Sequence, residues 1–237
     1  MTAVLRTDTG RVRKQNEDAA WLDESKAVFA VADGMGGHLA GEVASEMAIQ
    51  AVQRMAARHE GPSISVLREA VAEANSLIAA HVKAHPECTG MGTTLSLMWR
   101  GVKYVYIAHV GDSRIYRMRA GELERITQDH SLVEELVRAH VITREEAKTH
   151  PRRNIITRAL GVQGDSTPDL LAADVRPGDL WLLCSDGLSS MVDDEDIARV
   201  MRTGTSLDEM ADSLIAMALE AGGRDNVTLI LCREEEV

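Results

Sequence analysis

Residues 18–34 read DAAWLDESKAVFAVADG, and this stretch decides which fold the chain can adopt. Two apolar runs, Asp18–Leu22 and Ala27–Ala32, flank a polar connection, Asp23–Lys26. Short apolar runs on either side of a polar turn are typical of two antiparallel strands joined as a hairpin. We therefore expect a β-hairpin whose second strand is buried and ends in an acidic residue.

The hairpin brings two carboxylates onto one face. A turn centred on Glu24 and Ser25 places Asp18 opposite Val31. Because side chains alternate along a strand, Val31 and Asp33 share a face, and Asp18 lies on that same face. Two neighbouring carboxylates repel each other unless a cation lies between them, so the pattern indicates a cation site.

Acidic residues recur at the ends of other apolar stretches. Four such places are Asp33-Gly34, Gly111-Asp112, Asp186-Gly187 and Asp225-Asn226. A single aspartate in this position is most often a turn residue. Four are harder to explain as turns, because a carboxylate at the mouth of a buried strand costs free energy unless it is paired or binds a metal. Oxygen ligands favour Mg²⁺ or Mn²⁺ over zinc.

Arg13 lies five positions before Asp18 in a polar segment. Most arginines in such segments are solvated surface residues. An arginine beside a cluster of metal-binding carboxylates, however, suits bidentate capture of a phosphate group. Both interpretations stay open on this pattern alone.

The rest of the chain has a mixed order of elements. Further strands are expected at Ala3–Asp8, Thr93–Trp99, Tyr104–Val110, Arg114–Met118, Leu123–Thr127, Ile155–Ala159, Leu170–Val175, Leu180–Cys184 and Val227–Cys232. Helices are expected at Ala40–Arg58, Ile64–His85, Asp194–Met201 and Leu207–Ala221, and the polar stretch Ser131–Arg153 is weakly helical. Regular alternation of strand and helix is absent, which argues against a doubly wound parallel sheet. We expect an α+β protein of antiparallel sheets covered by helix pairs.

Composition narrows the class of protein. The 237 residues include 26 basic and 37 acidic ones, for a net charge of −11, and 45% are hydrophobic. These proportions exclude a fully disordered chain, and the acidic balance argues against a nucleic-acid partner. The three cysteines form no Cys-x-x-Cys pair, and the longest apolar runs are far shorter than the ~20 residues that span a membrane. We expect a cytoplasmic protein with no signal peptide and no membrane partner.

Six motifs, in order along nearly the whole chain, resemble those of the metal-dependent protein phosphatases of type 2C, most closely the small bacterial serine/threonine phosphatases. They are Arg13-Lys-Gln-Asn-Glu-Asp18, Val31-Ala-Asp-Gly-Met-Gly-Gly-His38, Gly92-Thr-Thr94, His109-Val-Gly-Asp-Ser-Arg114, Ser185-Asp-Gly-Leu188 and Gly223-Arg-Asp-Asn-Val-Thr228. Each motif alone is weak, but six in the family's order are specific. The resemblance implies a four-layer αββα sandwich, in which two antiparallel sheets are flanked by pairs of antiparallel helices.

The resemblance also assigns roles to residues. Asp33 would bridge two metal ions, Asp186 and Asp225 would complete the ligands of one, and the Gly34 carbonyl would bind the other. Glu17 and Asp18 would act directly or through water, and Asp112 would help to hold a weaker third ion. Arg13 would bind the substrate phosphate and His38 would be the general acid.

The implied activity is hydrolysis of phosphoserine and phosphothreonine by direct attack of a metal-bridging hydroxide, with Mn²⁺ or Mg²⁺ as cofactor. Phosphorylated proteins, including a cognate serine/threonine kinase and its substrates, would be the partners of a monomer. Residues 1–237 would form a single catalytic domain with a variable flap at about 131–164. Two alternatives stay open: a metal-dependent hydrolase of other phosphomonoesters, and a phosphoprotein-binding sensor on the same fold.

Two further histidines are expected to be structural. His109 lies inside an apolar strand, which indicates a core position. His130 follows Asp129, which we expect to serve as a helix N-cap.

Overall fold

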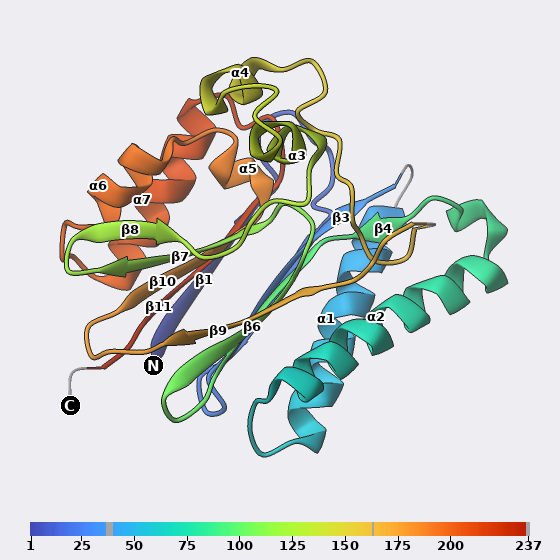
Figure 1. The fold of residues 1–237 in the computed structure, drawn as a ribbon, viewed down its shortest axis with the longest axis horizontal. Coiled ribbons are helices and arrows are strands. Elements are labelled where there is room, and N and C mark those ends of the chain that lie inside the picture. Colours follow the sequence, from blue (N-terminus) through green and yellow to red (C-terminus); the bar gives the residue numbers. More distant parts are fainter. Residues whose placement is uncertain (37–39, 163, 236–237) are drawn as a thin grey trace.

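Two antiparallel sheets are stacked face to face in the computed structural model, which describes residues 1–36, 40–162 and 164–235 (Figure 1). The first sheet has the order β1-β11-β10-β7-β8. Its strands are β1 (Thr2–Asp8), β11 (Val227–Arg233), β10 (Leu180–Cys184), β7 (Arg114–Arg119) and β8 (Glu122–Arg125). The second has the order β2-β3-β5-β6-β9, and β4 (Gly92–Thr93) pairs with the end of β3. Its strands are β2 (Asp18–Asp23), β3 (Val28–Met35), β5 (Leu95–Arg100), β6 (Tyr104–Val110) and β9 (Asp169–Asp174).

Alternate residues of the central strands fill two different layers. In β3, Phe29 and Val31 point into an apolar layer between the sheets, whereas Val28 and Ala30 point outward beneath helices. Trp181 of β10 lies in the same layer between the sheets. Because both faces of these strands are buried, their sequences are continuously apolar rather than alternating.

Helix pairs cover the outer faces of both sheets, as Figure 1 shows. On the second sheet lie α1 (Ala40–Arg58) and α2 (Ile64–Ala84), with a short 3₁₀ turn after them at Pro86–Cys88. On the first lie α5 (Asp186–Ser189), α6 (Asp194–Met201) and α7 (Leu207–Glu220). Ser63 and Ser206 cap the N-termini of α2 and α7 by accepting backbone N–H groups. The expected αββα sandwich is confirmed.

The register of the first hairpin differs from the expected one. Asp18 pairs directly with Asp33, not with Val31. The connection is longer than a two-residue tip because it runs from Glu24 to Ala27, which adopts a positive φ of 51° and donates its N–H to the Glu24 carbonyl. The shift is two residues, so both carboxylates keep the same face and stand closer together than expected.

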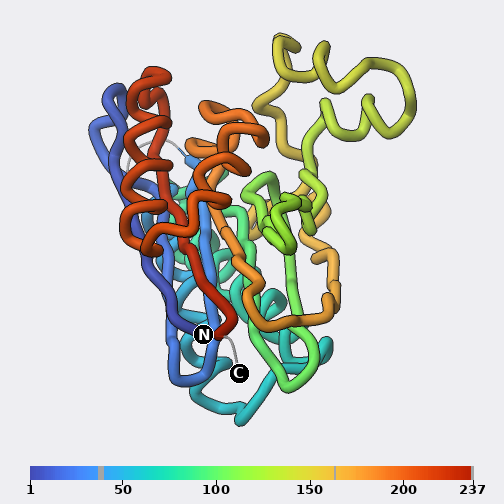
Figure 2. The backbone as a smooth tube through the Cα atoms, turned by 90° about the vertical axis from the view of Figure 1, so that its left-hand side faces the viewer, coloured from blue at the N-terminus to red at the C-terminus, as the bar shows by residue number. Residues whose placement is uncertain are grey.

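Residues 131–154 project from the body of the protein, as Figure 2 shows in yellow and olive. The later part of the expected flap returns to the body, where Ala159 and Leu160 are buried and Leu160 pairs with Thr93. The projecting residues contain two short helices, α3 (Leu132–Arg138) and α4 (Arg144–Thr149), in agreement with the weakly helical pattern. The expected strand at Ile155–Ala159 is wrong. Its backbone instead closes the base of this projection, since Leu132 donates to the Ile155 carbonyl and Thr157 donates to the His130 carbonyl.

Within the described ranges, no helix has both the length and the apolar character needed to cross a membrane. The three cysteines are free thiols, and Cys184 and Cys232 are buried.

Replacing Phe29 by alanine should destabilise the fold strongly. Phe29 is fully buried between the sheets, and its truncation is expected to cost about 3–5 kcal/mol of unfolding free energy. Val102 is 91% exposed, so Val102→Ala, the matched control, should stay within about 0.5 kcal/mol of the parent protein. Urea unfolding followed by tryptophan fluorescence measures both. Equal losses in the two variants would contradict the assigned layer between the sheets.

Candidate metal centre

Asp18 and Asp33 face each other where the apolar layer between the sheets ends. They are cross-strand neighbours in β2 and β3, and each is the next residue on the same strand face beyond that layer, after Ala20 and Val31 respectively. The main chain of Asp33 is fixed by Thr94, whose hydroxyl accepts the Asp33 N–H at 2.9 Å and whose N–H donates to the Asp33 carbonyl at 2.9 Å. The carboxylate pair is therefore held on a rigid edge of the second sheet.

The first sheet supplies two more carboxylates to the same place. Asp186 opens α5 two residues after the end of β10, and Asp225 lies two residues before β11. Ser185 joins the sheets, because its hydroxyl donates to Asp18 Oδ2 at 2.8 Å. Besides burial, the charges of Asp186 and Asp225 act on Asp33 and raise its pKa, so the acids of the two sheets lie within reach of one another. Four acidic side chains from both sheets thus gather at one end of the sandwich.

Burial and mutual repulsion raise the pKa values of Asp18, Asp33 and Asp186. Burial first, and then the charges of Asp18 and Asp186, raise the pKa of Asp33 well above its usual value. Burial raises the pKa of Asp18 to about 7, although the hydrogen bond from Ser185 opposes the shift. Burial and the charge of Asp225 raise the pKa of Asp186 to about 6. A bound divalent cation would reverse this effect by favouring the ionised carboxylates.

The donor set fits a hard divalent cation. All of these donors are carboxylate oxygens, and Asp18 Oδ1 is buried without a hydrogen-bond partner among the described residues. A buried, unpartnered carboxylate oxygen is costly, and a metal ion would satisfy it.

The side chains as they stand do not converge on a single point. In the part of the chain that the structure describes, no group of three or more His, Cys, Asp and Glu side chains is arranged to hold an ion. Asp225 instead turns toward Arg13, whose Nη2 lies 2.8 Å from Asp225 Oδ2, and Asp18 turns toward Ser185. The predicted phosphate-binding arginine therefore contacts a predicted metal ligand, and coordination would need these side chains to rotate.

Glu17 and Gly34 lie beside the carboxylates. The Gly34 N–H donates to the Glu17 carbonyl at 3.1 Å. A Cβ at Gly34 would stand 2.1 Å from the carbonyl oxygen of Gly41, so only glycine lets the end of β3 abut the first turn of α1. The Glu17 side chain is 18% exposed and lies 3.9 Å from Arg13, and its burial raises its pKa.

Asp112 stands next to Asp186 at the end of β6. Burial, and then the charge of Asp186, raise the pKa of Asp112 well above its usual value. Behind it, the Arg114 guanidinium grips Asp129 with both Nε and Nη2, the latter at 2.7 Å. Asp129 is therefore an ion-pair partner and not the expected N-cap, because Ser131 caps α3.

A cleft of about 640 Å³ opens beside this centre. It is lined by Asp112 and Asp186, by residues of the projecting segment and by residues of the α5–α6 connection. Lys148 of α4 and Asp193 meet across it in an ion pair of 2.6 Å. The cleft gives an extended ligand access to the carboxylates.

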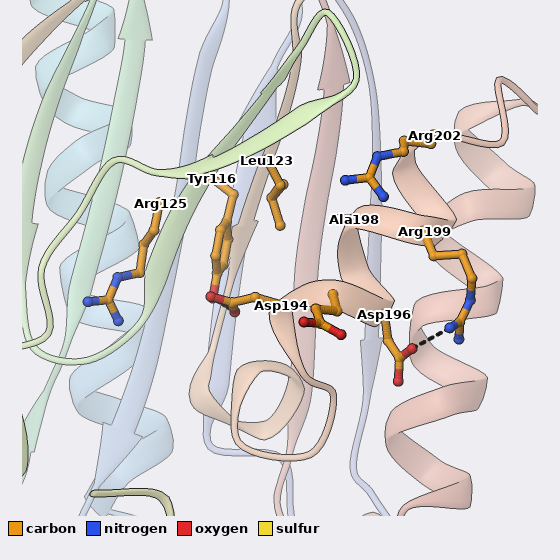
Figure 3. Close-up of a pocket in the computed structure, with 9 residues that line it drawn as sticks. Tyr116, Leu123, Arg125, Asp194, Asp196, Ala198, Arg199 and Arg202 are labelled. Atoms are coloured by element: carbon orange, nitrogen blue, oxygen red, sulfur yellow. Dashed lines mark hydrogen bonds and ion pairs between the residues drawn. The ribbon is translucent and has the colours of Figure 1, made fainter. Parts of the chain in front are cut away.

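A second hollow, of about 500 Å³, lies between β8 and α6 and contains none of the predicted site residues (Figure 3). Within it, Arg199 contacts Asp196 at 2.5 Å and the Tyr116 hydroxyl donates to Asp194 at 2.9 Å. It belongs to the outer face of the first sheet, away from the carboxylates.

The sequence pattern assigned no role to three residues of this site, which are Ser185, Asn226 and Thr94. Each stands directly beside a motif acid or within a motif, which is the signal that could have identified them. The expected core position of His109 is confirmed by its burial and its 3.0 Å hydrogen bond with Ser96. His38, the predicted general acid, lies outside the described residues.

Comparison with known proteins agrees with this picture. The sequence profile of the protein phosphatase 2C family matches residues 11–221. The serine/threonine phosphatase stp of Listeria welshimeri is 42% identical over 239 residues, which span 98% of this chain and 95% of that protein. The crystal structure of the Mycobacterium tuberculosis serine/threonine phosphatase PstP/Ppp superposes with a TM-score of 0.93 at 42% identity and covers 99% of both chains. A catalytic domain of PstP in complex with two manganese ions has a TM-score of 0.91 at 40% identity and covers 99% of this chain and 98% of that one.

The raised pKa values predict how stability depends on pH in the metal-free protein. Since Asp18 keeps its proton up to about pH 7 when folded but only to 3.8 when unfolded, the folded state binds more protons between these values. Its contribution to stability is therefore complete below the lower value and is lost as the pH rises through the upper one. Asp186 adds a smaller contribution that ends at about pH 6.

Asp18→Asn, studied in the presence of a chelator, isolates the Asp18 contribution. The unfolding free energy of the parent protein should fall relative to that of the variant as the pH rises through this window. Urea unfolding at a series of pH values measures the difference. Parallel curves for the two proteins would contradict the raised pKa of Asp18.

Proposed function

Because the chain belongs to the protein phosphatase 2C family, we propose that it is a serine/threonine protein phosphatase that hydrolyses phosphoserine and phosphothreonine in other proteins. The observation that carries the proposal is the gathering of Asp18, Asp33 and Asp186 from two sheets, where their repulsion calls for a cation. The manganese ions in a related catalytic domain support Mn²⁺ as that cation, with Mg²⁺ as the alternative.

The proposed metal ligands are those that the structure brings to this end of the sandwich. Asp33 would bridge two ions, Asp186 and Asp225 would complete the set for one, and the Gly34 carbonyl would serve the other. Asp18 and Glu17 would contribute directly or through water, and Asp112 would help to hold a weaker third ion. When bound, such ions would activate a water molecule for direct attack on phosphorus and would neutralise the phosphoryl oxygens.

Arg13 is the proposed phosphate-binding residue. Its side chain is 48% exposed and reaches the carboxylates from the open side. A guanidinium presents donors in a fork that matches two phosphate oxygens. A bound phosphate would compete with Asp225 for this guanidinium, and the present ion pair supports a role for Arg13 in binding the phosphoryl group.

His38 is the proposed general acid, on the basis of its place in the motif alone. Serine and threonine leave as poor alkoxides and need a proton in the transition state, which an imidazolium can donate. No cysteine or serine nucleophile is needed for direct attack by water. The buried thiols of Cys184 and Cys232 agree with this, because burial raises the pKa of Cys184 to about 12 and holds its thiol neutral.

The cleft beside Asp112 and Asp186 is the proposed path for the polypeptide around the phosphorylated residue. The projecting segment that walls it would set substrate preference. A kinase of the same cell and the proteins that it phosphorylates are the proposed partners of a cytoplasmic monomer. Polynucleotides are disfavoured as substrates, because the net charge of −11 repels them.

The chelated protein should be inactive toward a phosphothreonine peptide, and Mn²⁺ or Mg²⁺ should restore its activity. Asp33→Asn should lower turnover by about a thousandfold or more, since a ligand shared by two ions is lost. Phosphate release from the peptide measures both, and the same assay with nucleotides and sugar phosphates separates a protein phosphatase from a hydrolase of small phosphoesters. Full turnover after exhaustive chelation would refute the proposal.

His38→Ala should lower the rate of hydrolysis more for a phosphothreonine peptide than for nitrophenyl phosphate. The alkoxide leaving group needs a proton, worth roughly 10²–10⁴ in rate, whereas nitrophenolate needs much less help. Steady-state rates on both substrates, together with a series of aryl phosphates of rising leaving-group basicity, measure the effect. Equal losses on all substrates would reject the general-acid role.

A further inference from the structure

Asn226 is a buried amide next to the carboxylate cluster, and all of its side-chain hydrogen bonds go to one segment. The residue is 4% exposed and follows Asp225. Its Nδ2 donates to the carbonyl oxygens of Thr9 at 2.9 Å and Gln15 at 2.8 Å. Its Oδ1 accepts the Glu17 N–H at 2.8 Å. The side-chain amide of Asn226 therefore uses both its donor group and its acceptor in hydrogen bonds to the backbone of residues 9–17.

That segment carries Arg13 and has little else to define its shape. It joins β1 to β2 without helix or strand structure, and residues 11–15 are exposed. Its other backbone anchors to the body are the Arg11 N–H, which donates to the Gly223 carbonyl at 2.7 Å, and the Glu17 carbonyl. The latter accepts the Gly34 N–H at 3.1 Å and the Ser45 hydroxyl at 2.7 Å. Backbone groups that lack a regular ladder need other partners, and here one side chain supplies three of them.

Asp225, the residue before Asn226, also contacts the guanidinium of Arg13. The Asn226 N–H donates to Asp225 Oδ1 at 2.9 Å, and Asp225 Oδ2 lies 2.8 Å from Arg13 Nη2. The segment presses closely on this point, because a Cβ at Gly10 would stand 2.3 Å from the Asp225 carbonyl oxygen. Asp225 thus fixes the tip of the arginine while Asn226 fixes the backbone on both sides of it.

We propose that Asn226 is a positioning residue that acts through Arg13: it holds residues 9–17 so that the guanidinium faces the phosphate of the substrate. The inference rests on the proposed role of Arg13 as the phosphate-binding residue. Alanine would lose all three bonds, and aspartate would lose the two donated ones. An asparagine at this position therefore serves phosphate capture, not only the start of β11.

The test is a double-mutant cycle with Arg13→Ala, read as the affinity for inorganic phosphate. Isothermal titration calorimetry of the Mn²⁺-loaded protein gives the dissociation constant without turnover. Asn226→Ala should weaken phosphate binding about tenfold, since small displacements of a binding group have effects of this order or larger. In the Arg13→Ala background the same change should have almost no effect, because residues that act as one unit are not additive.

Two controls separate positioning from simple loss of structure. Asn75→Ala removes a similar bond, in which Asn75 Oδ1 accepts the Gly161 N–H at 2.8 Å far along the chain from Arg13, and should leave phosphate affinity unchanged. Mn²⁺ affinity, titrated separately, should change less than twofold in Asn226→Ala. If Asn226→Ala does not fold, Asn226→Ser replaces it, because serine cannot reach the three backbone partners and adds no charge.

Additive losses in the double variant would overturn the inference, and so would unchanged phosphate affinity in Asn226→Ala or a parallel loss of Mn²⁺ affinity. Hydrolysis of a phosphothreonine peptide by the parent protein is measured beside the cycle. Coupled phosphate binding without peptide hydrolysis would support the role of Asn226 and reject the proposed function, so that the two claims fail separately.

Discussion

The candidate metal centre depends on one constraint, which is the repulsion between carboxylates. Two stacked sheets bring these carboxylates together along one end of the sandwich, called here the carboxylate rim. The sheets share one apolar layer that contains Phe29, Val31 and Trp181. Where that layer ends, the residues that follow are polar. They lie close together because the two sheets pack against each other. Asp18 and Asp33 come from one sheet and Asp186 and Asp225 from the other. The raised pKa values of Asp18, Asp33 and Asp186 express the free energy that this placement costs, and a bound cation would recover it.

The polar partners around the rim serve its acids in two ways. Thr94 binds the main chain of Asp33, and Ser185 binds the carboxylate of Asp18. These hydrogen bonds link the ends of the strands. Arg114 and Asp129 form a buried pair behind Asp112, whose charge Arg114 partly offsets. The exposed side is left to Arg13, which is the only one of these groups that approaches from solvent. A substrate would therefore first meet the guanidinium of Arg13, and the carboxylates held by the two sheets would lie behind it.

Much of this was predictable because burial leaves a pattern in the sequence. The apolar runs of β3 and β10 end in acids, and that placement alone indicated a cation site. The register of the first hairpin was not predictable, since it depended on a positive φ at Ala27, a residue that rarely adopts one. The segment Ile155–Ala159 resembles a strand in its residue types, but its hydrogen-bond partners are residues at the base of the projection. Asp129 was misassigned because its partner, Arg114, lies far from it in sequence and only the fold pairs them.

Anomalous diffraction from crystals soaked in Mn²⁺, recorded near the manganese absorption edge, tests most directly whether these carboxylates bind a cation. We expect strong anomalous peaks within coordination distance of Asp33, with Asp186 and Asp225 turned toward them and Arg13 released from its ion pair. Peaks confined to surface sites, or a carboxylate rim that stays unchanged with Asp225 still bound to Arg13 at saturating Mn²⁺, would contradict this expectation.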